Sequence, residues 1–177
     1  MTDATLLLSL LIFLPTLGAL ILAFLPSDKP DLLKYFTLGV TAIVFALTIM
    51  GLLLPGGTAG GTGFNAELGT MQNVVNLPWI PSFNIQYLLG VDGISFPLVM
   101  LTGFVTLVSM GASWTITKFV KGYCILYLLL FTGMMGVFLS LDFFLFYVFW
   151  EVMLLPMYFL IGVWGGPRKE YAAIKYF

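Results

Sequence analysis

Histidine is absent from this chain of 177 residues, and Cys124 is its single cysteine. One cysteine cannot form a disulfide within the chain, and without histidine it cannot complete a zinc site of the usual kind. A cysteine-held iron–sulfur cluster and a histidine-ligated haem are excluded for the same reason. We therefore expect no metal site and no cofactor-binding site on this chain, and Cys124 is most simply a small apolar residue in a helix.

Charge is also scarce, because Asp, Glu, Lys and Arg make up 8% of the sequence and the formal net charge is −1. Such a chain has no basic field with which to bind nucleic acid. Hydrophobic residues make up 60% of the sequence and aromatic residues 16%, and the mean hydropathy is +1.07. A soluble domain of this length needs far more charge to cover its surface. The composition therefore predicts an integral membrane protein surrounded by a lipid bilayer.

Long apolar runs predict how this protein is organised. Each run is about the length that a helix needs to cross a bilayer. We predict a single all-α membrane domain, residues 1–177, with five spans at about 4–25, 35–54, 94–114, 123–140 and 143–164. Residues 171–177 have the composition of a sixth helix that stops after about two turns, which is too short to span. We expect that the protein continues beyond this point or that the sequence is a fragment.

The basic residues predict the orientation of the spans. All seven lie between the first and second spans, between the third and fourth, or after the fifth. With five spans these positions fall on one side of the membrane, which the positive-inside rule makes the cytoplasm. The amino terminus and the connection of residues 55–90 are then external.

That external connection has two parts. Residues 55–63 are rich in glycine, which predicts a flexible tip. Residues 81–87 alternate apolar and polar side chains with a period of two, which favours a short strand or hairpin at the membrane surface. Trp79 would then be an aromatic anchor at that surface.

Glu151 is the single charged residue in the run 143–164. It lies eight residues from the start of the run, which is roughly 12 Å along a helix that rises about 1.5 Å per residue. An ionisable group at that depth costs on the order of 3 kcal/mol, so it usually faces a partner, a water cavity or a proton path. The alternative is a protonated Glu151 that is hydrogen-bonded to a neighbouring helix.

Three neighbours make a hydrated site at Glu151 more plausible. Tyr147 and Tyr158 lie four and seven residues away, so they share one face of the helix with the acid. Two phenols could orient the carboxyl group and hold water, although an aromatic packing ridge is the alternative for the tyrosines. Pro156 cannot donate a hydrogen bond to the carbonyl of Val152, so we expect a bend there and a carbonyl that needs water or a neighbour.

Other polar and small residues have simpler interpretations. Asp92 and Asp142 open the third and fifth spans, where we expect them to cap the helix amino termini. Gly133 and Gly136 on the fourth span favour close approach of another helix. Lys175 enters the sixth helix from the cytoplasmic side, and its default role is to extend toward the lipid headgroups.

Three stretches of the chain are distinctive as a set: YLLGVDGISFPLV, LDFFLFYVFWEVMLLPMYFLIGVWGG and YAAIKYF. Together they resemble chain M (subunit 4) of the proton-pumping NADH–quinone oxidoreductases, the respiratory complex I family. The motif MLLPMY favours chain M over its sister chains and over cation/proton antiporter subunits. The resemblance covers this whole chain but only the first part of the family's longer chain.

The resemblance implies an antiporter-like half-channel bundle, which a chain of this length holds incompletely. It implies that Glu151 is the essential glutamate of the fifth helix, which pairs with a lysine of the seventh helix, and that Lys175 matches a lysine at the start of the sixth. The implied activity is proton translocation coupled to electron transfer from NADH to quinone. NADH, flavin, iron–sulfur clusters and quinone would bind to other membrane and peripheral subunits, and the location would be the bacterial cytoplasmic membrane.

Two further hypotheses remain open. A subunit of a multisubunit sodium/proton antiporter or of a membrane-bound hydrogenase would share the helix that carries the glutamate. A non-transporting membrane scaffold fragment is the other; Glu151 argues against it, whereas the short sixth helix argues for it.

Overall fold

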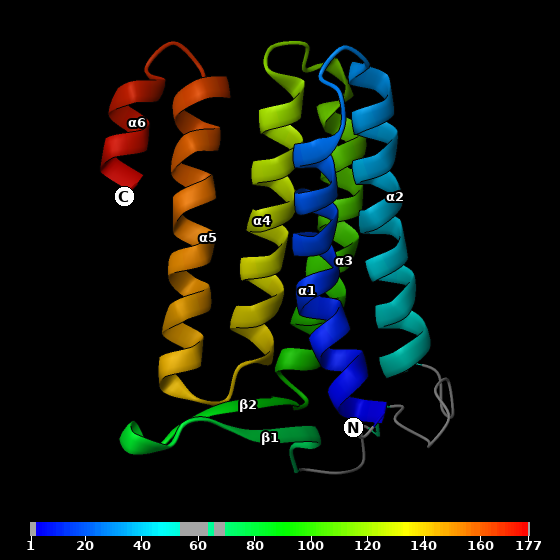
Figure 1. Ribbon diagram of the computed structural model, residues 1–177, viewed down its shortest axis with the longest axis vertical. Coiled ribbons are helices and arrows are strands. Elements are labelled where there is room, and N and C mark those ends of the chain that lie inside the picture. The colour runs from blue at the N-terminus through cyan, green and yellow to red at the C-terminus, as the bar shows by residue number, and fades with distance from the viewer. Residues whose placement is uncertain (1–2, 54–63, 66–69, 177) are drawn as a thin grey trace.

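The computed structural model describes residues 3–53, 64–65 and 70–176 (Figure 1). It contains five long helices: α1 (Asp3–Phe24), α2 (Pro30–Thr48), α3 (Ser95–Ala112), α4 (Val120–Leu139) and α5 (Phe143–Trp164). All five are long and apolar enough to cross a membrane. This confirms a mostly helical protein with five spans. The glycine-rich tip predicted at residues 55–63 lies outside the described residues.

Some helix bounds differ from the predicted ones by several residues. α2 begins at Pro30, with Asp31 in its first turn, rather than at residue 35. Proline suits the first position of a helix because the amide hydrogen there has no partner within the helix. The apolar run starts only after Lys34, so a search for apolar runs placed the start of the helix too late. A short sixth helix, α6 (Lys169–Tyr176), likewise starts before residue 171.

The connection between α2 and α3 contains a hairpin of two antiparallel strands, β1 (Gln72–Ile80) and β2 (Ile85–Val91), joined by a 3₁₀ turn at Pro81–Phe83. The predicted hairpin is therefore confirmed, but it is longer than residues 81–87, and the first three of these form its turn. Asn84 closes the turn with a φ of 54°, a left-handed conformation that asparagine tolerates well. Register shifts interrupt β1 on both sides of Val75–Pro78, and such bulges break the alternation by which a strand is found in a sequence.

The helices run alternately up and down (Figure 1). The connections α1–α2, α3–α4 and α5–α6 meet at one end, which we call the basic end because six of the seven Lys and Arg residues lie in these connections or in the adjoining helix turns, whereas Lys175 lies in the last turn of α6. The hairpin and the α4–α5 connection lie at the opposite end, which we call the hairpin end. The one-sided distribution of basic residues in the sequence is thus a one-sided distribution in space.

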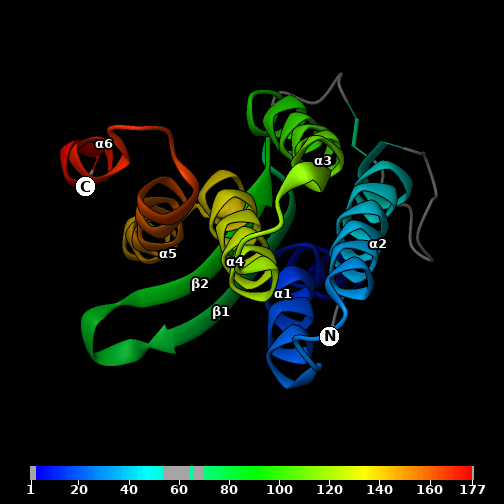
Figure 2. The ribbon, with the colours of Figure 1, turned by 90° about the horizontal axis from the view of Figure 1, so that it is seen from above.

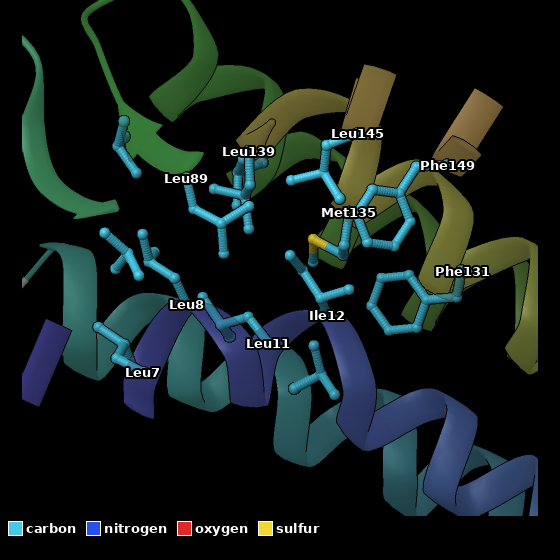
Figure 3. Close-up of a cluster of buried hydrophobic side chains, with 14 residues drawn as sticks. Leu7, Leu8, Leu11, Ile12, Leu89, Phe131, Met135, Leu139, Leu145 and Phe149 are labelled. Carbon is cyan, nitrogen blue, oxygen red and sulfur yellow. The ribbon is translucent and has the colours of Figure 1, made fainter. Parts of the chain in front are cut away.

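Two apolar clusters form the core. The cluster near the hairpin end joins α1, α4 and α5 to β2 through residues such as Leu11, Leu89 and Phe131 (Figure 3). The cluster near the basic end joins α1, α2 and α4 through Leu22, Leu33 and Leu128 and includes the fully buried Cys124. Cys124 therefore packs as a small apolar residue.

Lysine side chains stabilise the ends of three helices at the basic end. An ammonium group donates to the last carbonyls of α1, of α3 with its 3₁₀ extension, and of α5. The pairs are Lys121 with Ala23 and Leu25 (2.9 and 2.8 Å), Lys34 with Trp114 (2.7 Å) and Lys169 with Val163 (3.0 Å). A cation at a helix carboxyl terminus binds carbonyls that have no partner in the helix and complements the helix dipole.

Candidate functional site

The start of α5 is fixed by Asp142. Its Oδ1 accepts hydrogen bonds from the backbone N–H groups of Phe144 (2.9 Å) and Leu145 (3.1 Å). Its Oδ2 accepts a longer one, 3.4 Å, from the backbone N–H of Gln86 in β2. The predicted cap is therefore confirmed, and the same carboxylate also ties α5 to the hairpin, which the sequence did not indicate.

Asp92 plays the corresponding role at α3. Its Oδ1 accepts from the backbone N–H groups of Ile94 (3.0 Å) and Ser95 (2.6 Å), and Ser95 Oγ accepts from the backbone N–H of Asp92 (3.0 Å). The hydrogen bond from the Ser95 amide is the main reason why the pKa of Asp92 lies below its ordinary value. This predicted cap is also confirmed.

Close approach of α4 fixes how α5 is rotated about its own axis. A Cβ atom on Gly133 would lie 2.8 Å from the backbone of Met153, and one on Gly136 would overlap the ring of Phe149. Both predicted close contacts are confirmed. Because Phe149 and Met153 face α4, the face of α5 that carries Glu151 is turned away from it.

Glu151 is exposed on this outward face, and its side chain interacts with the phenol of Tyr147 one turn nearer the hairpin end. The structure thus brings together the two residues that the four-residue spacing predicted to be neighbours. Tyr158 lies on the same face two turns nearer the basic end, where α6 begins to cover α5. With Leu155, Phe159 and Ile174 it lines a cavity of about 420 Å³ between the two helices.

α6 turns back beside α5 and ends partway along it (Figure 1). The two helices pack closely at Gly162, where a Cβ would make an ordinary van der Waals contact of 3.6 Å with the Cβ of Ala173. Lys175 is exposed, and its ammonium group lies 5.7 Å from the centre of the Tyr171 ring. Lys175 thus lies in the last turn of α6, a helix that runs from the basic end toward the level of Glu151, and the ring of Tyr171 is its neighbour.

Pro156 is buried, and α5 continues through it as one helix from Phe143 to Trp164. The carbonyl of Val152 has no amide hydrogen to accept from this position, because proline carries none. The bend predicted at Pro156 stays a prediction.

Lys34 is the residue whose position the sequence analysis missed. It was counted as part of a cytoplasmic connection, yet only 6% of its surface is exposed and it lies over the Trp114 ring as well as against the Trp114 carbonyl. The pattern Pro30-Asp31 could have placed Lys34 inside a helix, since it marks a helix start ahead of Lys34, but it does not reveal the contact with Trp114.

These features define a multi-pass membrane protein whose fifth span carries a glutamate on a face that its own bundle leaves open. Residues 64–141 match a family model described as NADH-ubiquinone oxidoreductase chain 4, amino terminus. Residues 140–177 match a second one, described as NADH:quinone oxidoreductase/Mrp antiporter, TM. Together the two matches cover residues 64–177, over which the chain is similar to chain 4 of the NADH–quinone oxidoreductases.

Curated relatives agree with this assignment. NAD(P)H-quinone oxidoreductase chain 4 from the chloroplast of Chlorokybus atmophyticus is 35% identical over 169 residues, which cover 96% of this chain and 31% of the relative. A chain 4 from Picosynechococcus is 36% identical and is covered over 29% of its length. The chain thus spans about a third of the length of the curated relatives it matches.

Solved structures show the same fold. A chain of respiratory complex I from Thermus thermophilus matches with a TM-score of 0.69 at 18% identity, over 94% of this chain and 31% of that one. A chain of an archaeal membrane-bound sulfane sulfur reductase matches with a TM-score of 0.66 at 20% identity, over 96% of this chain and 33% of that one.

Proposed function

We propose that this chain contributes the first five helices and the start of the sixth to a subunit that moves protons across a membrane, coupled to electron transfer from NADH to quinone. The similarity to chain 4 of the NADH–quinone oxidoreductases supports the proposal. The observation that carries it is the position of Glu151: an acid at membrane depth, beside the phenol of Tyr147, on a face of α5 that α4 does not cover.

In this proposal Glu151 takes up and releases the translocated proton. A carboxyl group in an apolar setting favours its neutral form, and a cation that approaches it favours the charged form. A lysine that moves toward Glu151 and away again therefore changes the occupancy of the proton. Part of the subunit that this chain does not span, or another subunit, would supply that lysine. Tyr147 holds the carboxyl group in one orientation.

Lys175 and Tyr158 would help to carry protons between Glu151 and the basic end. Tyr158 lines the cavity between α5 and α6, and Lys175 projects from the last turn of α6. A protonatable amine and a phenol along this edge can relay a proton through water toward the acid. Pro156 contributes by freeing the Val152 carbonyl as a hydrogen-bond acceptor at the same depth.

The remaining assignments follow from the same proposal. The basic end faces the cytoplasm of a bacterial cell and the amino terminus lies outside. Other membrane and peripheral subunits are the partners, and they hold NADH, flavin, iron–sulfur clusters and quinone. No redox centre resides on this chain, because it lacks the histidine and cysteine ligands that haem and iron–sulfur clusters require.

The test is Glu151→Gln in the assembled oxidoreductase, with Glu170→Gln as the matched control. Both variants remove one carboxylate and keep its shape, but Glu170 lies exposed in the first turn of α6 at the basic end. Proton translocation, measured in inverted vesicles with a pH-sensitive dye, should be lost in Glu151→Gln and kept in Glu170→Gln. Glu151→Asp should retain part of the activity. Parental translocation by Glu151→Gln, at normal coupling to electron transfer, would overturn the proposal.

Orientation is tested separately by cysteine labelling in a Cys124→Ala background. Ser27 lies at the basic end and Ser82 lies exposed in the turn of the hairpin. A membrane-impermeant maleimide added to intact cells should label Ser82→Cys, whereas Ser27→Cys should react only after the membrane is opened. Labelling of both positions from one side contradicts the five-span arrangement, and reversed labelling contradicts the proposed orientation.

A further inference from the structure

A second cavity lies on a different face of α5 from Glu151. It has a volume of about 680 Å³ and opens between α1, α4 and α5 at the hairpin end. The helices contribute Phe13, Thr132 and Val152 among others, and the hairpin contributes Trp79 and Tyr87. Its volume is in the range typical of sites for small ligands.

The wall of this cavity requires an apolar occupant. Its two threonine hydroxyls, of Thr16 and Thr132, are hydrogen-bonded to each other at 2.8 Å. The hydroxyl of Tyr87 is hydrogen-bonded to that of Ser9 at 3.1 Å. The lining side-chain hydroxyls thus already have partners, and a ligand that brought polar groups to this depth would have to bury them without compensation.

The depth of the cavity matches one leaflet of a bilayer. α5 enters at Phe143 and reaches the cavity residue Val152 nine residues later, which is about 14 Å at about 1.5 Å per residue. The hydrocarbon core of a bilayer is about 30 Å thick, so one leaflet occupies about 15 Å. The cavity therefore extends from the membrane surface at the hairpin end to about the middle of the bilayer.

The hairpin closes the outer end of this space. Leu77, Pro78 and Trp79 of β1 line it, and the hairpin passes across the gap between α1 and α5 (Figure 2). A membrane-spanning helix, from the rest of this subunit or from another, needs a channel about 10 Å wide through the whole core. The hairpin blocks that route, whereas a single flexible chain that enters sideways from the lipid fits beneath it.

We propose that this cavity is a binding site for one acyl chain of a phospholipid from the leaflet at the hairpin end. The ester region lies at the level of Trp79, where an indole ring suits the boundary between lipid and water. The methylene groups run between α1 and α5, and the chain end reaches Val152 and Leu129. The bound chain fills the gap that α1 and α5 leave on the side of α4 and so supports the position of α5.

Photolabelling of the full chain in phosphatidylcholine vesicles tests this orientation without any substitution. Two phosphatidylcholine probes carry a diazirine either close to the ester or at the end of the acyl chain. The first should label Trp79 and Leu77, and the second should label Val152 and Leu129, each at least about fivefold over Val108. Val108 is the reference because it is 53% exposed on α3, where lipid contact is unspecific. Labelling at the level of Val108, or labelling that does not depend on the probe position, would overturn the proposal.

Filling the cavity provides the second test. Val148→Phe and Val152→Phe each place a ring inside it, and Val108→Phe makes the same change on the open face of α3. The first two should remove labelling inside the cavity while the labelling of α3 persists, which shows that the chain is folded; Val108→Phe should leave cavity labelling intact. Unchanged cavity labelling in both filled variants would contradict the site. A diazirine fatty acid that labels the cavity where the phospholipid probes do not would instead identify free fatty acid as the ligand and refute the phospholipid.

Discussion

The bundle of α1–α4 and the pair α5–α6 differ in how completely they are packed. In α4, 56% of the spanning stretch is buried, whereas in α5 the share is 17%. α4 lies between α1 and α5 (Figure 2), while α5 rests on α4 with one side only and carries the intramembrane acid on another. An ionised side chain that faces lipid costs on the order of 3 kcal/mol. Under the function proposed above, protein or water therefore covers the open face of α5 when Glu151 is ionised.

The two regions also differ in how they satisfy polar groups. The buried hydroxyls of Thr37, Thr48 and Thr106 each donate to the carbonyl four residues earlier in the same helix. These bonds need nothing from another helix and leave no group free to exchange a proton. Glu151 instead interacts with Tyr147, a group that can both donate and accept. The candidate proton-exchanging group thus lies in the loosely packed region.

The largest loss of stability should come from a substitution that pushes α5 away from α4. Gly133→Ala places a Cβ 2.8 Å from the backbone of Met153, which cannot rotate away, so α5 has to move. We expect a loss of about 1–3 kcal/mol in the free energy of unfolding, measured by thermal unfolding in detergent. Gly111→Ala is the matched control, because a Cβ there meets nothing within 4 Å and alanine favours helix by up to about 1 kcal/mol.

A second variant of α4 distinguishes a clash with a side chain of α5 from a clash with its backbone. In Gly136→Ala the new Cβ meets Cγ and the ring of Phe149 rather than backbone, so Phe149→Ala, which removes Cγ, should make the double variant more stable than the sum of the two single losses predicts. The same Phe149→Ala should show no such gain with Gly133→Ala. Equal stability of Gly133→Ala and Gly111→Ala would show that close approach of α4 does not fix α5.

A somewhat smaller loss of stability should follow when a buried lysine is replaced, and a still smaller one when a partly exposed lysine at the end of α5 is replaced. Lys34→Met removes a charge-assisted hydrogen bond from a side chain that is 6% exposed, and we expect a loss of about 2 kcal/mol. Lys169→Met removes the corresponding bond at the end of α5, where the side chain is only partly buried and water can replace it. Its loss should stay below about 1 kcal/mol. Similar melting temperatures for the two variants would contradict this contrast.

Local patterns in the sequence were sufficient for the spans, for the caps at Asp92 and Asp142, and for the glycine contacts of α4, because each depends on a few neighbouring residues or on helix periodicity. The burial of Lys34 was missed because it depends on α3 lying beside α2. The length of the hairpin was missed because the bulges in β1 break the alternation.

The candidate site was predictable to a similar extent. Periodicity places Tyr147 and Glu151 on one face of α5, and the structure brings them together. It could not show that Ile174 of α6 lines a cavity with Tyr158, or that a carboxylate oxygen of Asp142 accepts from β2. These relations join segments that lie far apart in the sequence, and only their packing reveals them.

A substitution in the connection between α4 and α5 should lower the free energy of unfolding less than a substitution in the contact between the two helices. Asp142→Ala removes the acceptor for two amides of α5 and one of β2, and caps of this kind contribute about 1 kcal/mol. Asp142→Asn, which keeps an acceptor oxygen, should restore most of that stability. Thermal unfolding of both variants, compared with the parental chain, measures the difference. An Asn variant as unstable as the Ala variant would show that the negative charge matters more than the hydrogen bonds.

The smallest effect concerns the cap of α3 and depends on pH. The Ser95 amide holds the pKa of Asp92 below its ordinary value of 3.8. The unfolded chain therefore binds a proton at a higher pH than the folded chain, so the cap stabilises the fold above about pH 4 and this contribution is lost as the pH falls through the lowered pKa. The Asp92→Asn variant cannot titrate there, and between about pH 6 and pH 3 its melting temperature should fall less than that of the parental chain. Because Asp92 is at the exposed start of α3, the difference should also shrink in high salt. Identical pH dependence in the two proteins would show that Asp92 is not the group that titrates.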